Sequence, residues 1–99
     1  MLRLSGTLDV ANADAVETAA ATRLEKASPT APLVIDMGQV RFVSATGIDV
    51  LASIHQEALR RGTSLALRGA DPSVITDLVG RVGLDEGLVI LPDRLAARS

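Results

Sequence analysis

The chain has 99 residues, a formal net charge of −2 and a hydrophobic content of 47%, with Phe42 as its only aromatic residue. This composition suits one domain with an aliphatic core, and the lack of cysteine excludes disulfides and thiolate chemistry. Arg60-Arg61 is the only basic doublet, so we expect no nucleic-acid binding. No apolar run approaches the ~20 residues that span a bilayer and no signal peptide is apparent, so we expect a cytoplasmic protein that does not bind membranes.

The first predicted elements are a strand and an alanine-rich helix. Apolar and polar residues alternate around Gly6 from Leu2 to Leu8, which indicates a strand with a bulge or turn near its end. Asp9 and Asn12 are cap candidates for a helix from about Ala13 to Ala27. Its expected buried face consists of Val16, Ala20, Leu24 and Ala27.

A buried strand and a second helix follow. The strand covers Leu33 to Met37 and contains Asp36, whose carboxylate we expect to bond to the backbone of a neighbouring loop. Gly38-Gln39 then predicts a turn, and the helix runs from about Gly47 to Arg61. Its expected apolar stripe consists of Ile48, Leu51, Ala52, His55 and Leu59. The single histidine is therefore expected to be a packed residue rather than a metal ligand or a general base.

The last elements are two short strands on either side of a third helix. The strands cover Ser64 to Arg68 and Leu88 to Leu91, and Asp71-Pro72 supplies a cap and a first helical residue. The helix ends near Gly83, and its expected buried residues are Val74, Leu78 and Val82. The alternation of strands and helices predicts an α/β fold with parallel pairs and right-handed crossovers.

The corner Ser44-Ala45-Thr46-Gly47 places hydroxyl groups at the start of the second helix. Unpaired amides and the positive end of the helix dipole suit a phosphate or an acidic partner group there. Thr46 with Asp49 fits a Thr-x-x-Asp cap, and a capping hydroxyl can still accept phosphate. Ser44 is a second acceptor, a substitute cap, a neutral replacement for a carboxylate, or a loop serine bonded to nearby backbone.

Several segments in order carry a resemblance to one family. They are the strand Val34-Ile35-Asp36, the pair Val40 and Val43, the corner Ser44 to Ile48, and the flanks Leu4 to Asp9, Leu67 to Ala70 and Val82 to Leu84. Over about residues 2–92 the sequence resembles a STAS domain, the family of bacterial anti-sigma factor antagonists. The resemblance implies a single STAS domain over 1–99 with a short tail over 93–99. Its sheet would be mixed, mostly parallel, with about four strands and about three crossover helices.

The resemblance also implies a switch without enzymatic activity or a cofactor. The unphosphorylated chain would bind an anti-sigma factor and release a sigma factor. That anti-sigma factor would itself be a serine/threonine kinase that uses ATP and phosphorylates Thr46, with Ser44 as the second candidate, and a phosphatase would reset the switch. The residues expected to contact the partner are Ser44, Ala45, Thr46, Gly47, Asp49, Val50, Ser53, Asp9 and Asn12. No metal site is expected.

Two departures from the family pattern leave alternatives open. Ser44 stands where relatives carry aspartate and Ala45 where they carry their first serine. Many relatives also have a further strand before Leu2, so the chain is a short variant, is truncated, or has its sheet edge covered by another chain, as in a homodimer. The alternative function is a STAS interaction subunit, such as a partner of the ATPase of a lipid-trafficking ABC transporter. A small enzyme or nucleotide-binding protein finds little support, because no Gly-x-x-x-x-Gly-Lys loop or paired nucleophile and base is present.

Overall fold

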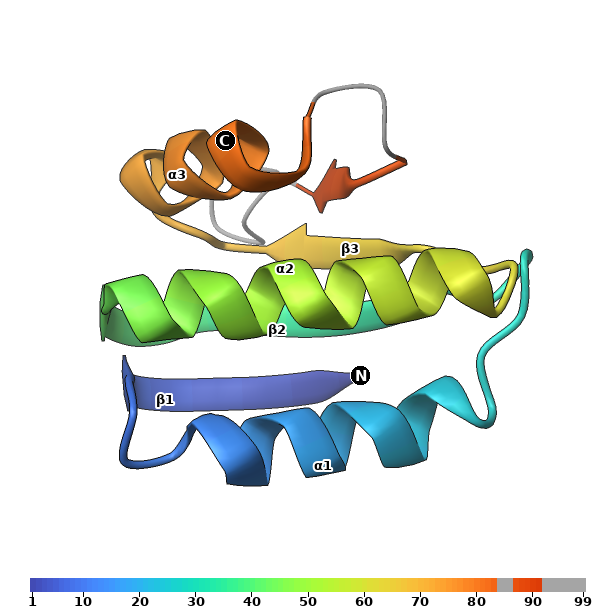
Figure 1. Cartoon of the computed structure of the whole chain (residues 1–99), viewed down its shortest axis with the longest axis horizontal. Coiled ribbons are helices and arrows are strands. Elements are labelled where there is room, and N and C mark those ends of the chain that lie inside the picture. Colours follow the sequence, from blue (N-terminus) through green and yellow to red (C-terminus); the bar gives the residue numbers. More distant parts are fainter. Residues whose placement is uncertain (84–86, 92–99) are drawn as a thin grey trace.

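Strands and helices alternate along the whole described chain in the computed structural model, which covers residues 1–83 and 87–91 (Figure 1). The elements are β1 (Leu2–Leu8), α1 (Ala13–Leu24), β2 (Leu33–Val43), α2 (Ala45–Arg60), β3 (Leu65–Arg68), α3 (Pro72–Val82) and β4 (Val89–Leu91). The expected order of elements is therefore confirmed, and the tail predicted over 93–99 lies outside the described residues. No helix in the described part of the chain is long and apolar enough to cross a membrane.

The four strands form one sheet in the order β1-β2-β3-β4, and all three described pairs are parallel. Each connection between neighbouring strands must then return to the starting end of the sheet, and a helix makes each return. Helix α2 lies across β2 and β3, between α1 and α3 (Figure 1). The predicted α/β fold is thus confirmed, with no antiparallel pair between the strands described.

The core lies between the sheet and the helices. Side chains along a strand point alternately to the two faces of the sheet, so every second residue faces the core. Leu33, Ile35 and Met37 of β2 are buried. Leu65 and Leu67 of β3 pair in register with the first two and are fully buried, because paired residues of parallel strands point to the same face.

Helix α2 buries a wide face against this core because α1 and α3 pack on its two sides. Leu51 and His55 are both completely buried in that face. The expectation that His55 is a packed residue is confirmed.

Three local predictions about β2 and α2 need correction. Gly38-Gln39 does not turn the chain, because β2 continues to Val43 and pairs with β1 along this stretch. Two register shifts in the β1–β2 pairing accommodate the irregular backbone, and one falls between Gly6 and Thr7, where a bulge was expected. Asp36 accepts a backbone hydrogen bond as expected, from the Gly38 amide at 2.9 Å, but Gly38 lies in β2 and not in a loop. Helix α2 begins at Ala45, two residues before the expected start.

Candidate partner-binding site

The corner of Ser44 to Gly47 lies beside the loop that follows β1. Strands β1 and β2 are parallel and end in register at Leu8 and Val43, so the segments that follow them leave the same edge of the sheet. The Ser44 amide donates a hydrogen bond to the Leu8 carbonyl oxygen at 2.9 Å and fixes the corner to the end of β1. The structure therefore brings together the two segments, 9–12 and 44–47, that the sequence proposed for partner binding.

Gly47 allows the first turn of α2 to approach β1 closely. A Cβ atom at this position would lie 2.5 Å from the Leu8 carbonyl oxygen and 2.7 Å from Cγ1 of Val43. The requirement is steric, because Gly47 has no positive φ angle. A glycine here lets the corner pack directly against β1, so the fold determines where the corner lies.

Ser44 is the N-cap of α2, so the prediction that Thr46 caps this helix is wrong. The Ser44 backbone is extended, with φ −76° and ψ 173°, and its Oγ accepts a hydrogen bond from the Gly47 amide at 3.1 Å. Thr46 lies inside the first turn, where a residue has helical torsions and cannot cap. Its side chain is exposed.

The first turns of α2 divide into exposed and buried positions. Ala45, Thr46, Asp49 and Ser53 are exposed. Gly47 and Val50 are buried, with only 5% of Val50 accessible. The expectation that the Val50 side chain contacts a partner does not fit this position, because the side chain packs into the core.

Asp49 forms an ion pair with Arg81 of α3. Both side chains are about half exposed, 56% for Asp49 and 49% for Arg81, so the pair contributes little to stability. It does reduce the negative charge that Asp49 presents one turn from Thr46.

Asp9 and Asn12 shape the loop that flanks the corner rather than capping α1 with their side chains. Asn12 occupies the N-cap position, but its side chain makes no capping hydrogen bond. It instead donates to the Thr7 carbonyl oxygen at 2.7 Å and accepts from the Asp9 amide at 2.9 Å. Asp9 accepts from the Ala11 amide at 3.0 Å. These bonds turn the chain sharply and leave Val10 at the surface.

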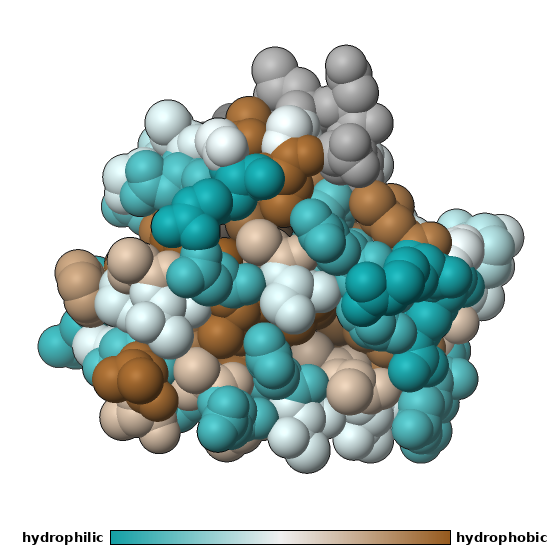
Figure 2. Space-filling view, viewed as in Figure 1, coloured by the Kyte–Doolittle hydropathy of each residue, from teal (hydrophilic) through white to brown (hydrophobic). Residues whose placement is uncertain are grey.

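Two exposed apolar residues at this edge were missed by sequence analysis. Val10 is 77% exposed and Phe42 is 59% exposed. Figure 2 shows an apolar patch at the lower left, over the loop that joins β1 to α1. The available signal was the position of the only aromatic residue, two residues before the corner. Aromatic side chains are frequent anchors of protein interfaces, which makes the exposed Phe42 the more informative of the two.

This edge of the molecule presents polar and apolar groups at its surface. No group of three or more metal-ligating side chains occurs in the residues that the structure describes. The corner offers an exposed threonine hydroxyl, first-turn amides without partners inside the helix, and the nearby apolar side chains of Val10 and Phe42. This combination suits docking of a protein partner and acceptance of a negatively charged group.

Comparisons with known proteins agree with this description. The family model for the STAS domain matches residues 1–94. Among solved structures, the chain is similar to the anti-sigma factor antagonist SpoIIAA in its unphosphorylated form, with a TM-score of 0.66 and 14% sequence identity. The match covers 97% of this chain and 81% of the SpoIIAA chain, and at this identity it shows a shared fold. A search of curated protein sequences found no match.

Proposed function

Because the chain belongs to the STAS domain family, we propose that it acts as an anti-sigma factor antagonist that docks through the corner of Ser44 to Gly47. The observation that carries the proposal is the fixed, exposed corner at the end of β2, joined to the loop of 9–12 by the Ser44–Leu8 hydrogen bond. The unmodified chain binds the anti-sigma factor and thereby frees a sigma factor. It performs no catalysis, and ATP is bound by the partner.

The docking surface is proposed to consist of the polar corner together with two exposed apolar residues of the adjoining segments. Ala45, Thr46 and Asp49 supply the exposed part of the helix start, while Val10 and Phe42 supply apolar area. Burying such side chains contributes most of the energy of a typical protein interface, and the polar groups set its orientation. The exposed fractions of Val10 and Phe42 support this assignment.

Phosphorylation of Thr46 is proposed as the switch. The hydroxyl is exposed in the first turn of α2, where the helix dipole stabilises a phosphate of about −1.5 to −2 charge. The Asp49–Arg81 ion pair lowers the repulsion that such a phosphate would meet. A phosphate here places a strongly hydrated charge in the docking surface, and its desolvation opposes binding.

Ser44 is the less suitable acceptor of the two. Its hydroxyl is partly buried and accepts the hydrogen bond from the Gly47 amide. A phosphate on Ser44 would have to disturb the N-cap of α2, whereas a phosphate on Thr46 leaves the cap in place. The proposal therefore assigns the modification to Thr46 and a structural role to Ser44.

Calorimetric titration against the cognate anti-sigma factor tests the proposal. Thr46→Ala should bind as the wild type does, and Thr46→Glu should bind at least about tenfold more weakly, a difference of ~1.4 kcal/mol. Mass spectrometry after incubation with the partner and ATP should find phosphate on the wild type and none on Thr46→Ala. Equal affinities of all three proteins, with no phosphate on Thr46 or Ser44, would leave a docking module without a switch. Failure of the wild type to bind any anti-sigma factor would refute the antagonist function itself.

A further inference from the structure

The second half of β2 has a strand partner on one side only. Pairing of β2 with β3 ends at Asp36 and Arg68, while pairing with β1 continues to Val43. In the described part of the chain, Met37–Val43 therefore presents an unpaired backbone edge on the side of β3. At ~3.3 Å per residue this edge is about 23 Å long. Unpaired strand edges are templates for another extended chain.

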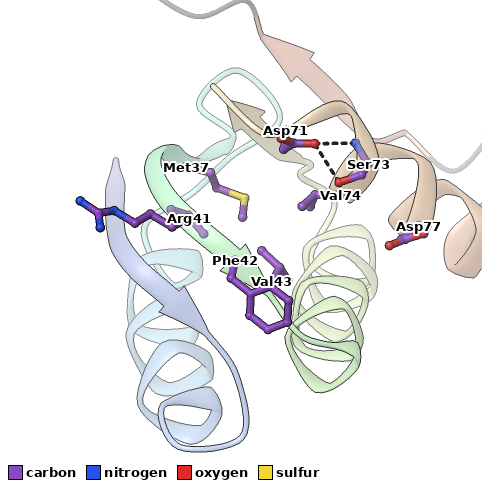
Figure 3. Close-up of a pocket in the computed structure, with 9 residues that line it drawn as sticks. Met37, Arg41, Phe42, Val43, Asp71, Ser73, Val74 and Asp77 are labelled. Atoms are coloured by element: carbon purple, nitrogen blue, oxygen red, sulfur yellow. Dashed lines mark hydrogen bonds between the residues drawn. The ribbon is translucent and has the colours of Figure 1, made fainter.

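A cavity of about 270 Å³ runs along this edge, between β2 and the start of α3. Met37 and Val74 extend into it from opposite walls (Figure 3). Both side chains are buried, so the inner part of the cavity is apolar. The exposed ring of Phe42 lies at the rim. The cavity is smaller than typical small-molecule sites, and its long side is a strand edge, which favours a peptide segment over a compact ligand.

The charges on the walls of this cavity favour particular side chains in a bound segment. Asp71 and Asp77 lie on the α3 wall, whereas Arg41 extends away from that wall toward β1 (Figure 3). The amide and the hydroxyl of Ser73 both donate hydrogen bonds to the Asp71 carboxylate, at 2.9 Å and 2.8 Å. These two hydrogen bonds hold the pKa of the Asp71 carboxyl below its usual value. The wall that faces the β2 edge is thus acidic, and it complements lysine or arginine.

We propose that the groove between β2 and α3 binds an extended segment of a partner protein, in which an apolar residue has lysine or arginine two positions before it and two positions after it. Residues two positions apart point to the same face of a strand, so these three side chains can all face α3. The segment adds a strand to the Met37–Val43 edge, places an apolar side chain over Met37 and Val74, and directs cationic side chains toward Asp71 and Asp77. The backbone bonds supply affinity, and the side chains on the face toward α3 supply specificity. This binding mode does not depend on which protein docks at the corner of Ser44 to Gly47.

The test uses the peptide Ser-Lys-Thr-Val-Thr-Lys-Ser, in which both lysines and the valine share one face of a strand, and amide chemical shifts of the full chain. The largest shifts should fall on Met37–Val43 and on the start of α3. A peptide with the same sequence but N-methylated at the valine, both threonines and the second lysine keeps its charge and loses two backbone donors to β2 in either register. It should bind about tenfold more weakly or worse, as expected from loss of two or more hydrogen bonds. A peptide with glutamate in place of lysine should also bind more weakly.

Variants of the α3 wall test whether the peptide binds at this groove or is attracted only by the net negative charge of the protein. Asp77→Lys should weaken the lysine peptide about two- to fivefold, the effect of one exposed ion pair. Glu25→Lys makes the same charge change on an exposed residue at the end of α1 and should leave binding within about twofold. Ser73→Trp should block the groove sterically. Scattered shifts, equal binding of the N-methylated peptide, or equal effects of Asp77→Lys and Glu25→Lys would overturn the proposal.

Discussion

The close approach of Gly47 to β1 can be tested with two Gly→Ala substitutions. In Gly47→Ala the new Cβ would lie 2.5 Å from the Leu8 carbonyl oxygen. That oxygen is held by the Ser44 amide at 2.9 Å, so it cannot move away without loss of a hydrogen bond. Overpacking of this kind costs about 1–3 kcal/mol, while alanine in a helix gains about 0.5–1 kcal/mol over glycine. The difference between these ranges gives a net loss of about 1 kcal/mol, and at most about 2.5 kcal/mol, in the free energy of unfolding.

Gly80→Ala is the matched control. Gly80 lies within α3, is exposed, and has no atom within 4 Å of the position that a Cβ would occupy. Only the propensity gain remains, so this variant should be about 0.5–1 kcal/mol more stable than the wild type. Urea denaturation of the three proteins, with slopes compared, measures both changes. Stabilisation of Gly47→Ala by the same amount as Gly80→Ala would refute the steric argument.

Three further predictions concern caps and charge. Ser44→Ala should cost about 0.5–2 kcal/mol in urea denaturation because the Gly47 amide loses its acceptor, and an unchanged midpoint would contradict the cap assignment. Thr46→Ala should lie within about 0.5 kcal/mol of the wild type in the same assay because the side chain is exposed; a larger loss would indicate a structural role. The folded pKa of Asp71 is depressed below 3.8, so its contribution to stability is present above this unfolded value and is lost as pH falls through the folded pKa. Asp71→Asn should therefore lose less stability than the wild type as the pH falls. Thermal unfolding of both proteins between about pH 2 and pH 5 measures this difference, and parallel curves of melting temperature against pH would contradict it.

Local signals in the sequence were sufficient for most of the fold. Asp71-Pro72 combines a capping carboxylate with a proline that fits only the first helical turn, and α3 begins there. The Gly38-Gln39 error has a non-local cause. Those residues favour a turn in isolation, but pairing with β1, made possible by two register shifts, keeps them in the strand.

The errors at the site have the same origin. Ser44 and Thr46 both carry hydroxyls near the helix start, and the choice between them as cap depends on the bond from the Ser44 amide to Leu8, 36 positions earlier in β1. Val50 fell outside the narrow apolar stripe expected for α2. It is buried because α1 and α3 pack against both sides of α2 and widen the buried face. A periodicity argument treats a helix as having one neighbour and cannot give this width.

The residues that fix the position of the corner are not the residues that lie exposed at its surface. Ser44 and Gly47 hold the start of α2 against β1 through a cap, a backbone bond and a contact that tolerates no Cβ. Thr46 lies between them with an exposed side chain. A charge added to its hydroxyl would therefore change the surface that a partner meets while the bonds that place the corner remain. Because those bonds define the N-terminus of the helix, the same arrangement keeps first-turn amides and the positive end of the dipole directed at the added charge. Under the proposed phosphorylation of Thr46, the modified hydroxyl thus lies at a position where the modification leaves the bonds of the corner in place.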